Sequence, residues 1–298
     1  MVTSQTDRPS ILSPWLRVGP LTIMMVIFFV APIGIFFVYS FWTKEGWDIV
    51  RQWTFENYIY VLTSPVYTKL IFRSLGVGLR IAILSVIIVY PLAYTMVFKF
   101  EKYRDLILFL LAISLFSNYL VRIYAWRAIL SSNGLVNWLL MSAGLADGPQ
   151  PYLLYSQWGV ILILLNVYLP FATLPIYSAL LNLDRDVIAA AADLGASPLR
   201  VFAEVTLPLT MPGVIVSFVF IFLLTSGDFV TPVFVGGKEG MMIGNAVAEQ
   251  FGALANWPLG SAMVFSTVLI IGLLLGLIFL VYRIVQNVIN RKRYDLYR

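Results

Sequence analysis

The stretch VGPLTIMMVIFFVAPIGIFFVYSFWT, residues 18–43, lies between Arg17 and Lys44 and contains no charged residue. A membrane-spanning helix needs about 20 consecutive apolar residues, so this stretch is long enough to cross a bilayer. No small-residue cleavage site follows it, and we therefore expect it to remain in the chain as an anchor. It assigns the chain to the membrane proteins.

Further uncharged intervals follow along the chain at 81–98, 106–121, 128–146, 148–183, 205–227 and 250–282. The interval 128–146 is the weakest of them, because SSNG opens it and its apolar residues lie on one helical face, which favours a short interfacial helix. The remaining intervals predict an all-α polytopic membrane protein with six spans, near 20–42, 76–98, 106–126, 158–180, 209–229 and 261–283. One transmembrane domain would then cover 18–290, between an N-terminal tail at 1–17 and a basic tail at 291–298.

The composition agrees with this class and removes several kinds of chemistry. Of 298 residues, 60% are hydrophobic and only 12% are charged, about half the share that a soluble domain carries. The chain contains no His and no Cys. Ser-His-Asp and Cys-His catalysis, HExxH zinc sites, CxxC redox motifs and disulfides are therefore excluded.

The Lys and Arg residues predict the orientation of the spans, because cytoplasmic loops carry an excess of them. With both termini in the cytoplasm, the inner side would hold most of these residues, namely Arg8, Arg17, Lys99, Lys102, Arg104, Arg185, Arg200, Arg283, Arg291, Lys292, Arg293 and Arg298. We therefore interpret the net charge of +5 as a sign of membrane topology. We expect no nucleic-acid partner, since no basic groove interleaved with stacking aromatics is evident.

One inner connection differs from the others in length and content. Residues 181–213 read LNLDRDVIAAAADLGASPLRVFAEVTLPLTMPG. Val187–Leu194 is a helix former, Gly195 can end that helix, and Ser197-Pro198 can start another. The composition alone is typical of an elbow that joins two spans, and it predicts a helix–turn–helix at the cytoplasmic surface over 184–212.

The spacing within this segment resembles the coupling motif of the membrane subunits of binding-protein-dependent ABC importers. That motif reads Glu-Ala-Ala, three residues, Gly, nine residues, an aliphatic residue, one residue, and Leu-Pro. The matching residues and their neighbours here are Ala190, Ala191, Asp193, Gly195, Ser197, Val205, Leu207 and Pro208, while Ala189 replaces the usual Glu. The resemblance implies that this helix docks into a groove of a cytoplasmic ATPase. Loss of the Glu carboxylate removes one polar contact to that partner.

Three other stretches resemble the spermidine/putrescine-type permeases of that family, at 114–140, 226–237 and 256–265. The resemblance implies a permease subunit in a bacterial inner membrane that forms half of a translocation pathway for a polyamine. Another amine, an opine or an amino-acid-like solute is the alternative substrate. The implied partners are a second, homologous permease as the other half of a heterodimer, an ABC ATPase dimer that binds ATP and Mg, and an extracytoplasmic solute-binding protein.

Two groups of residues are candidates for the translocation pathway. Asp228 ends the fifth span beside Phe229 and Thr231, and an acid at the mouth of a span can attract a cationic solute. Equally, it can be a hydrated acid or one paired with Arg122 or Arg127. The run Asn118, Tyr119, Arg122, Tyr124, Trp126 and Arg127 can bind a cation through its aromatic faces, but an interfacial belt that docks the binding protein explains it better.

The sequence contains no site for ATP. Gly237-Lys238 suggests a phosphate-binding loop, but Pro232 stands where the first Gly is needed and Glu239 replaces the Ser or Thr. We therefore expect no enzyme activity, no cofactor and no metal in this chain.

Two other classes remain open, an ion-coupled secondary transporter and a non-transporting scaffold. The near absence of ionisable residues within the spans and the lack of a repeat argue against the first, and the coupling segment argues against the second.

Overall fold

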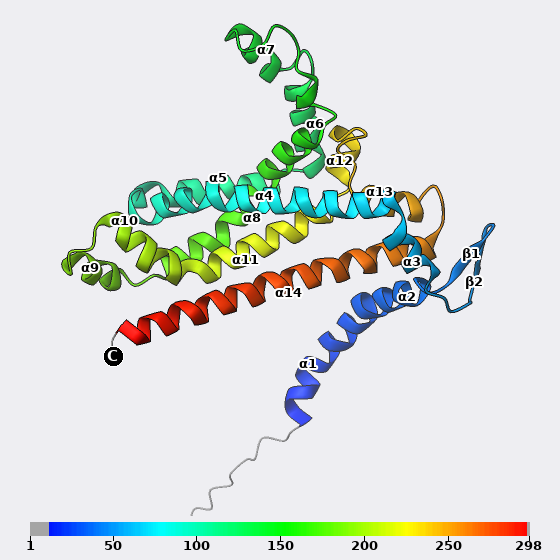
Figure 1. Ribbon diagram of the computed structural model, residues 1–298, viewed down its shortest axis with the longest axis horizontal. Coiled ribbons are helices and arrows are strands. Elements are labelled where there is room, and N and C mark those ends of the chain that lie inside the picture. The colour runs from blue at the N-terminus through cyan, green and yellow to red at the C-terminus, as the bar shows by residue number, and fades with distance from the viewer. Residues whose placement is uncertain (1–11, 297–298) are drawn as a thin grey trace, which may run out of the picture. The chain divides into compact units, whose positions relative to one another are not determined.

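The computed structural model describes residues 12–296, with side chains described for residues 18–284. Most of the described chain is helical (Figure 1), which confirms the predicted all-α class. Much of the expected N-terminal tail, residues 1–11, and the last two residues of the expected basic tail, 297–298, lie outside the described residues.

Among the described residues, five helices are long and apolar enough to span a membrane. They are Val18–Tyr39, Pro65–Phe98, Gln157–Leu181, Pro198–Ser226 and Trp257–Ile284. A bent pair, Glu101–Phe116 with Tyr119–Ser142, makes a sixth span if both helices are counted as one. The number therefore agrees with the sequence-based expectation of about six.

The chain divides into two compact units, of which unit 1 comprises residues 1–63 and 249–269. It contains α1 (Leu12–Met25), the π-helical turn η1 (Val26–Val30), α2 (Ala31–Tyr39) and α3 (Glu56–Thr63). It also contains the end of α13 (Ile243–Phe251) and the start of α14 (Trp257–Leu296). Aromatic side chains pack edge to face within this unit, including Phe36 on Phe251 with ring centroids 5.4 Å apart.

A two-stranded hairpin lies between α2 and α3. Strand β1 (Thr43–Glu45) pairs antiparallel with β2 (Asp48–Val50), and Thr43 faces Val50 in the register. Gly46 has a φ of +61° in the connecting turn, a left-handed conformation that glycine adopts without steric cost. The Lys44 ammonium donates a hydrogen bond of 2.6 Å to the Leu254 carbonyl, which ties the hairpin to the loop before α14.

Unit 2 comprises residues 64–248 and 270–298, and three long helices form its centre. These are α4 (Pro65–Phe98), α8 (Gln157–Leu181) and α11 (Leu207–Ser226), and each packs on the other two. Their facing side chains are fully buried, for example Ile81 on α4, Ile163 on α8 and Phe222 on α11. Because lipid is as apolar as these side chains, close packing rather than the hydrophobic effect holds such helices together.

Small residues allow the backbones of these helices to approach closely. A Cβ added to Gly213 of α11 would lie 2.7 Å from the Pro175 carbonyl of α8, and it would also meet the Ala179 side chain. A Cβ on Gly78 of α4 would lie 3.3 Å from the Phe222 carbonyl of α11. A side chain at Gly213 would force α8 and α11 apart, and one at Gly78 would require the Ser226 side chain and the Phe222 region to shift.

The third expected span, 106–126, is built from two helices. The 3₁₀ turn η2 (Glu101–Tyr103) leads into α5 (Arg104–Phe116), and α6 (Tyr119–Leu130) follows. The stretch Tyr119–Ser142, which begins with α6, is bent by 96° from Glu101–Phe116. The Asn118 side chain accepts hydrogen bonds from the amides of Leu120 and Val121 and so caps α6. This capping starts a new helix in a new direction, which the lack of charge in 106–121 could not reveal.

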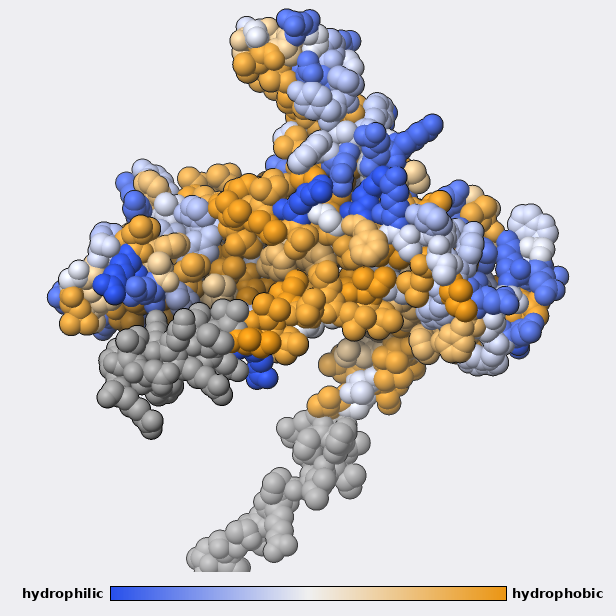
Figure 2. All heavy atoms as spheres, viewed as in Figure 1, coloured by the Kyte–Doolittle hydropathy of each residue, from blue (hydrophilic) through white to orange (hydrophobic). Residues whose placement is uncertain are grey.

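The remaining elements of unit 2 are short. They are α7 (Leu135–Ser142), the 3₁₀ turn η3 (Pro151–Leu153), α9 (Arg185–Asp193), α10 (Pro198–Val201), the π-helical turn η4 (Phe202–Thr206) and α12 (Val230–Val235). Helix α7 lies within 128–146, where we expected a short interfacial helix. Figure 2 shows hydrophobic side chains over the long helices, while hydrophilic side chains gather near α9–α10 and around the base of α6.

Candidate functional site: a capped elbow and a buried carboxylate

The predicted coupling segment folds as a helix–turn–helix with a side-chain cap at the start of each helix. Asp184 precedes α9, and its side chain accepts a hydrogen bond of 2.9 Å from the Asp186 amide. Ser197 precedes α10, and its hydroxyl accepts a bond of 3.4 Å from the Arg200 amide, with Pro198 at the first helical position. Both caps satisfy amides that a helix start leaves without partners.

Gly195 makes the turn between the two helices. Its φ is +84°, and the backbone around it forms a Schellman motif, in which two amides close back onto the last turn of α9. The Gly195 amide donates to the Ala192 carbonyl at 2.9 Å, and the Ala196 amide donates to the Ala191 carbonyl at 3.2 Å. A Cβ at Gly195 would meet nothing within 4 Å, so the backbone conformation alone explains the glycine.

The elbow presents apolar side chains on its surface. Leu194 is 89% exposed and Leu199 is 77% exposed. Beside them lies a hollow of about 310 Å³, lined by Ala191, Leu194, Gly195, Ala196, Arg200, Val201, Glu204 and Val205. Ala189, Ala190, Asp193 and Ser197 are also exposed, while Val205 and Leu207 are half-buried. An exposed apolar knob beside a hollow is typical of a surface that receives a protein partner.

The second limb of the elbow is anchored to α4. The Phe202 ring packs edge-on against Tyr90 and Tyr94, with centroids 5.7 Å and 6.1 Å away. The Tyr90 and Thr210 hydroxyls form a buried hydrogen bond of 2.8 Å. Residues Pro198–Ser226 run as one helical stretch through η4 into α11. The elbow is therefore the beginning of a span, and Val205, Leu207 and Pro208 lie on that continuous helix.

The first limb of the elbow is tied to the loop that follows α4. The Arg185 guanidinium donates a hydrogen bond to the Glu101 carboxylate and another, of 3.4 Å, to the Val97 carbonyl. It also lies 5.9 Å from the centre of the Phe98 ring. The Arg185 hydrogen bond and charge lower the pKa of the Glu101 carboxyl below its ordinary value. This link joins two segments that are 84 residues apart in the sequence.

A second cluster forms around Asp228, between α11 and α12. Asp228 is only 7% exposed, and its carboxylate accepts hydrogen bonds from the Tyr119 hydroxyl and, at 3.2 Å, from the Tyr168 hydroxyl. It also accepts a bond of 2.9 Å from the Thr231 amide and so caps the first turn of α12. A buried carboxylate requires such donors, because burial without them costs several kcal/mol.

The protons in this cluster have a defined direction. Tyr119 has one hydroxyl proton, and an ionised carboxylate can only accept. Tyr119 must therefore donate to Asp228, and the Thr231 hydroxyl must donate to the Tyr119 oxygen, 2.7 Å away. The fully buried Thr231 thus supports Tyr119, and Tyr119 supports Asp228.

The structure separates the other expected pathway residues. Phe229 is 47% exposed, and its carbonyl accepts a hydrogen bond from Asn245. Tyr124 packs on Phe234 with ring centroids 5.1 Å apart, and the Trp126 indole donates to the Asn166 side chain at 2.9 Å. Asn118 serves as the cap of α6. Of the expected residues, Asp228 and Thr231 therefore meet in one cluster, while Asn118, Tyr124 and Trp126 have separate contacts.

The alternative pairing of Asp228 with an arginine is wrong. Arg122 donates to the Val167 carbonyl at 3.3 Å, and Arg127 donates to the Tyr155 hydroxyl at 3.0 Å. In the part of the chain that the structure describes, neither forms an ion pair with Asp228. The carboxylate instead accepts a hydrogen bond from Tyr168, a residue of α8 that the sequence did not indicate and that lies 60 residues before Asp228. Among the side chains that the structure describes, residues 18–284, no group of three or more acidic residues could hold a metal ion.

Comparison with known proteins now gives the family. Residues 7–294 match the family described as "Binding-protein-dependent transport system inner membrane component". The chain belongs to this family and is a permease subunit of an ABC importer. The resemblance drawn from the coupling motif is thereby confirmed, and the secondary transporter and the non-transporting scaffold are set aside.

Several relatives of high similarity are permeases named for spermidine and putrescine. The chain is 33% identical to the spermidine/putrescine transport system permease protein PotB of Escherichia coli K12, over 90% of this chain and 96% of that protein. It is 34% identical to PotB of Haemophilus influenzae, over 90% of this chain and 92% of that protein. It is also 30% identical to the inner membrane ABC transporter permease protein YdcU of Escherichia coli K12, over 88% of this chain and 87% of that protein.

Solved structures share the fold. A chain of a bacterial ABC transporter involved in the import of the acidic polysaccharide alginate matches with a TM-score of 0.71 at 18% identity. The match covers 91% of this chain and 95% of that chain. At this identity the likeness concerns the architecture alone.

Proposed function

We propose that this chain is a permease subunit for a polyamine of the spermidine or putrescine class. The observation that carries the proposal is its identity of 32–34% to PotB proteins over about 90% of its length. The proposed substrate is a flexible polycation. A buried carboxylate framed by tyrosines, as at Asp228, has the chemistry to attract such a cation.

The proposed assembly contains further chains. A second, homologous permease would supply the other half of the pathway, and an extracytoplasmic binding protein would deliver the solute. A pair of cytoplasmic ATPase subunits would bind ATP and Mg, so that hydrolysis takes place outside this chain. The exposed Leu194 and Leu199 and the adjacent hollow support a docking role for the α9–α10 elbow.

The proposed location is a bacterial inner membrane with both termini in the cytoplasm. This orientation places α9 and α10 on the cytoplasmic side, where the ATPase would dock. It places Asp228 and α12 at the outer end of α11. The three ion pairs formed by the described side chains join Arg104 with Asp105, Arg185 with Glu101, and Arg200 with Glu204. All of them fall on the proposed inner side.

In the proposed mechanism, closure of the ATPase pair moves the elbow, and the continuous helix from Pro198 to Ser226 carries that motion to the outer mouth. The α9–α10 elbow contacts the α4 side of unit 2 through Phe202 and Arg185. Movement of the elbow would therefore shift α4 and α11 together, and the spans would alternate between outward and inward access.

The Asp228→Asn variant tests the role of the carboxylate. Asn keeps the shape and removes the negative charge, and its single carbonyl oxygen can replace only one of the two carboxylate oxygens, either the one that accepts from the Thr231 amide or the one that accepts from Tyr119. Uptake of radiolabelled spermidine by cells should fall by about tenfold or more if the charge guides the amine, with the amount of transporter in the membrane unchanged. Thr231→Val, which removes only the supporting hydroxyl, should have a smaller effect. Unchanged uptake by Asp228→Asn would remove the residue from the pathway and leave it as a cap of α12.

A further inference from the structure

Two hollows on the proposed outer half of unit 2 adjoin each other and differ sharply in chemistry. One has a volume of about 430 Å³ and is lined by Leu84, Tyr152, Leu153, Trp158, Gly159, Ile161, Leu162 and Leu165. The other has a volume of about 750 Å³ and is lined by Lys69, Arg73, Pro151, Tyr152, Tyr155, Ser156, Gln157, Trp158, Lys238 and Glu239. Tyr152 and Trp158 line both, so the two hollows are parts of one surface.

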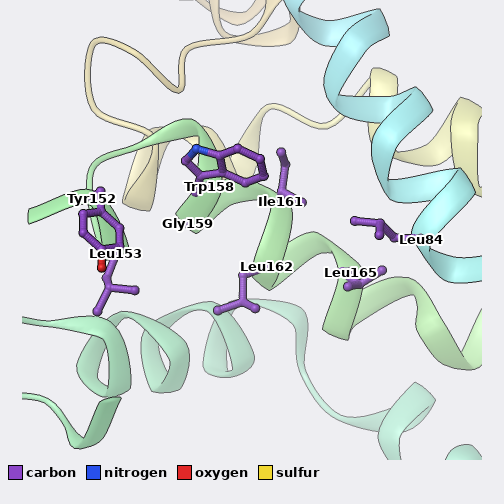
Figure 3. Close-up of a pocket in the computed structure, with 8 residues that line it drawn as sticks. All are labelled: Leu84, Tyr152, Leu153, Trp158, Gly159, Ile161, Leu162 and Leu165. Carbon is purple, nitrogen blue, oxygen red and sulfur yellow. The ribbon is translucent and has the colours of Figure 1, made fainter. Parts of the chain in front are cut away.

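The first hollow is an apolar groove along the helices. Figure 3 shows Leu84 of α4 beside Leu165 of α8, with Tyr152 at the opposite end of the groove. The groove follows α8 from Trp158 near its start to Leu165, a distance of about 10 Å at 1.5 Å per residue. Leu162 is 40% exposed and Leu84 is 36% exposed. Part of the lining therefore remains open, over about two thirds of the 15 Å or so that one leaflet of a bilayer covers.

The second hollow carries positive charge without carboxylate partners. Lys69, Arg73 and Lys238 form no ion pair with any described residue. Arg73 is oriented by backbone, because its Nη1 donates to the Lys238 carbonyl at 3.3 Å and to the Met241 carbonyl at 3.2 Å. Glu239 is the one acidic residue in the lining. The second hollow therefore brings three cationic side chains together and has a net positive charge. Arg73 is held in position by its hydrogen bonds to backbone.

We propose that this composite surface is a binding site for an anionic phospholipid. The headgroup phosphate would lie among Lys69, Arg73 and Lys238, since a guanidinium matches the geometry of phosphate oxygens. An acyl chain would lie in the groove between Leu84 and Leu165, and Trp158 would mark the interface between the two, as tryptophans do in membranes. The site does not serve a cationic solute, because its charge repels an amine. The inference is independent of the proposed substrate.

Native mass spectrometry of the transporter, purified through a tag on this chain, tests the site. The probes are phosphatidylglycerol and phosphatidylcholine with identical acyl chains, and glycerol 3-phosphate as the headgroup without chains. We expect wild type to retain phosphatidylglycerol in preference to phosphatidylcholine and to retain no glycerol phosphate. Equal retention of both lipids, or retention of glycerol phosphate alone, would overturn the proposal.

Variants with matched controls separate the two halves of the site. Lys69→Gln with Lys238→Gln should weaken phosphatidylglycerol retention by about 25-fold, since each cation near an anionic lipid contributes about fivefold. Lys99→Gln with Lys102→Gln makes the same change in net charge on the opposite side and should leave retention at the wild-type level. Both pairs of lysines are exposed, so the fold is preserved. Retention that falls equally in the two double variants would show a general charge effect and contradict the site.

The groove is tested by Leu84→Trp, which fills it with a larger side chain. The control is Leu92→Trp on the same helix, because Leu92 is 38% exposed and Leu84 is 36% exposed. Leu84→Trp should reduce retention of phosphatidylglycerol, and Leu92→Trp should not. If Leu84→Trp instead dissociated a protein subunit and left lipid retention intact, the groove would be a subunit contact and the proposal would fail.

Discussion

The glycine between α9 and α10 allows a direct test of the coupling elbow. At Gly195 the φ of +84° lies in the left-handed region, which costs an L-residue about 1–2 kcal/mol. Nothing lies within 4 Å of an added Cβ, so Gly195→Ala should cost this backbone term and no steric term. A cost of this size lowers the equilibrium constant for closing the turn by about 5–30-fold. Gly195→Asn should cost less, because asparagine tolerates the left-handed region.

Two assays report the effect at different levels. Hydrogen exchange at the amides of Gly195 and Ala196, which close the turn onto Ala192 and Ala191, should accelerate by 5–30-fold in the Ala variant. The rate of ATP hydrolysis by the purified transporter, stimulated by solute-loaded binding protein, should be highest in wild type, lower in Gly195→Asn and lowest in Gly195→Ala. Gly195→Trp should abolish stimulation and reduce co-purification of the ATPase, because the large side chain projects into the space that the partner would occupy.

Gly144 provides a matched control for this experiment. It ends α7 with a φ of +69°, its amide bonds the Met141 carbonyl at 3.1 Å, and the Leu145 amide bonds the Leu140 carbonyl at 2.9 Å. Gly144→Ala therefore carries the same backbone penalty in the same motif, with nothing within 4 Å of the added Cβ. It should leave ATPase stimulation unchanged. Normal stimulation in Gly195→Trp, or an equal loss in Gly144→Ala, would refute the assignment of the elbow as the docking element.

Two further predictions concern the stability of unit 2. Gly213→Ala should lower the thermal midpoint of the purified transporter by an amount equivalent to about 1–3 kcal/mol, because the new methyl group would overlap the Pro175 carbonyl. The control Gly272→Ala has nothing within 4 Å of its added methyl group and should leave the midpoint unchanged. Equal midpoints in the two variants would contradict the packing of α8 on α11. Because Arg185 lowers the pKa of Glu101 from 4.5, their ion pair should stabilise the folded state above about pH 4.5 and lose its effect as the pH falls through the lowered pKa. Glu101→Gln should therefore lower the thermal midpoint near pH 7, and its difference from wild type should shrink as the pH falls through the lowered pKa. Glu239→Gln should leave the midpoint near pH 7 unchanged.

The coupling elbow could be predicted from sequence because its determinants are local. The helix former at 187–194, the glycine after it and the Ser-Pro start are neighbours in the chain, and each acts through backbone geometry within a few residues. The folded α9, the Gly195 turn and the Ser197 cap lie within the expected coupling segment 184–212, although α9 begins at Arg185, two residues before the predicted helix former.

The Asp228 cluster could be predicted only in part, because it depends on packing between distant segments. Asp228 stood out as an acid at the end of a span, and Tyr119 belonged to a conspicuous polar run. Tyr168 gave no such signal, since one tyrosine in the long apolar interval 148–183 resembles any other. Its role arises because α8 packs on α11 and α12 and brings its hydroxyl within 3.2 Å of the carboxylate. Hydroxyl groups donate to the carboxylate, and the alternative in which Arg122 or Arg127 pairs with it is not realised.

The bend between α5 and α6 shows a similar limit. An uncharged interval gives the length available to a span but carries no information on its direction. The sequence shows Asn118 as a polar residue at the outer end of the third span, but its role as a cap depends on the position of its side chain against the Leu120 and Val121 amides.

The continuity of the helix from Pro198 to Ser226 has a mechanical consequence. Its 29 residues correspond to about 44 Å at 1.5 Å per residue, with the elbow at one end and Asp228 two residues beyond the other. A straight rod of that length would convert a tilt of about 5° at one end into a displacement of about 4 Å at the other, somewhat less than the 5.4 Å pitch of one helical turn. Small rotations at the elbow are thus amplified into a movement large enough to rearrange the hydroxyl groups around a single carboxylate.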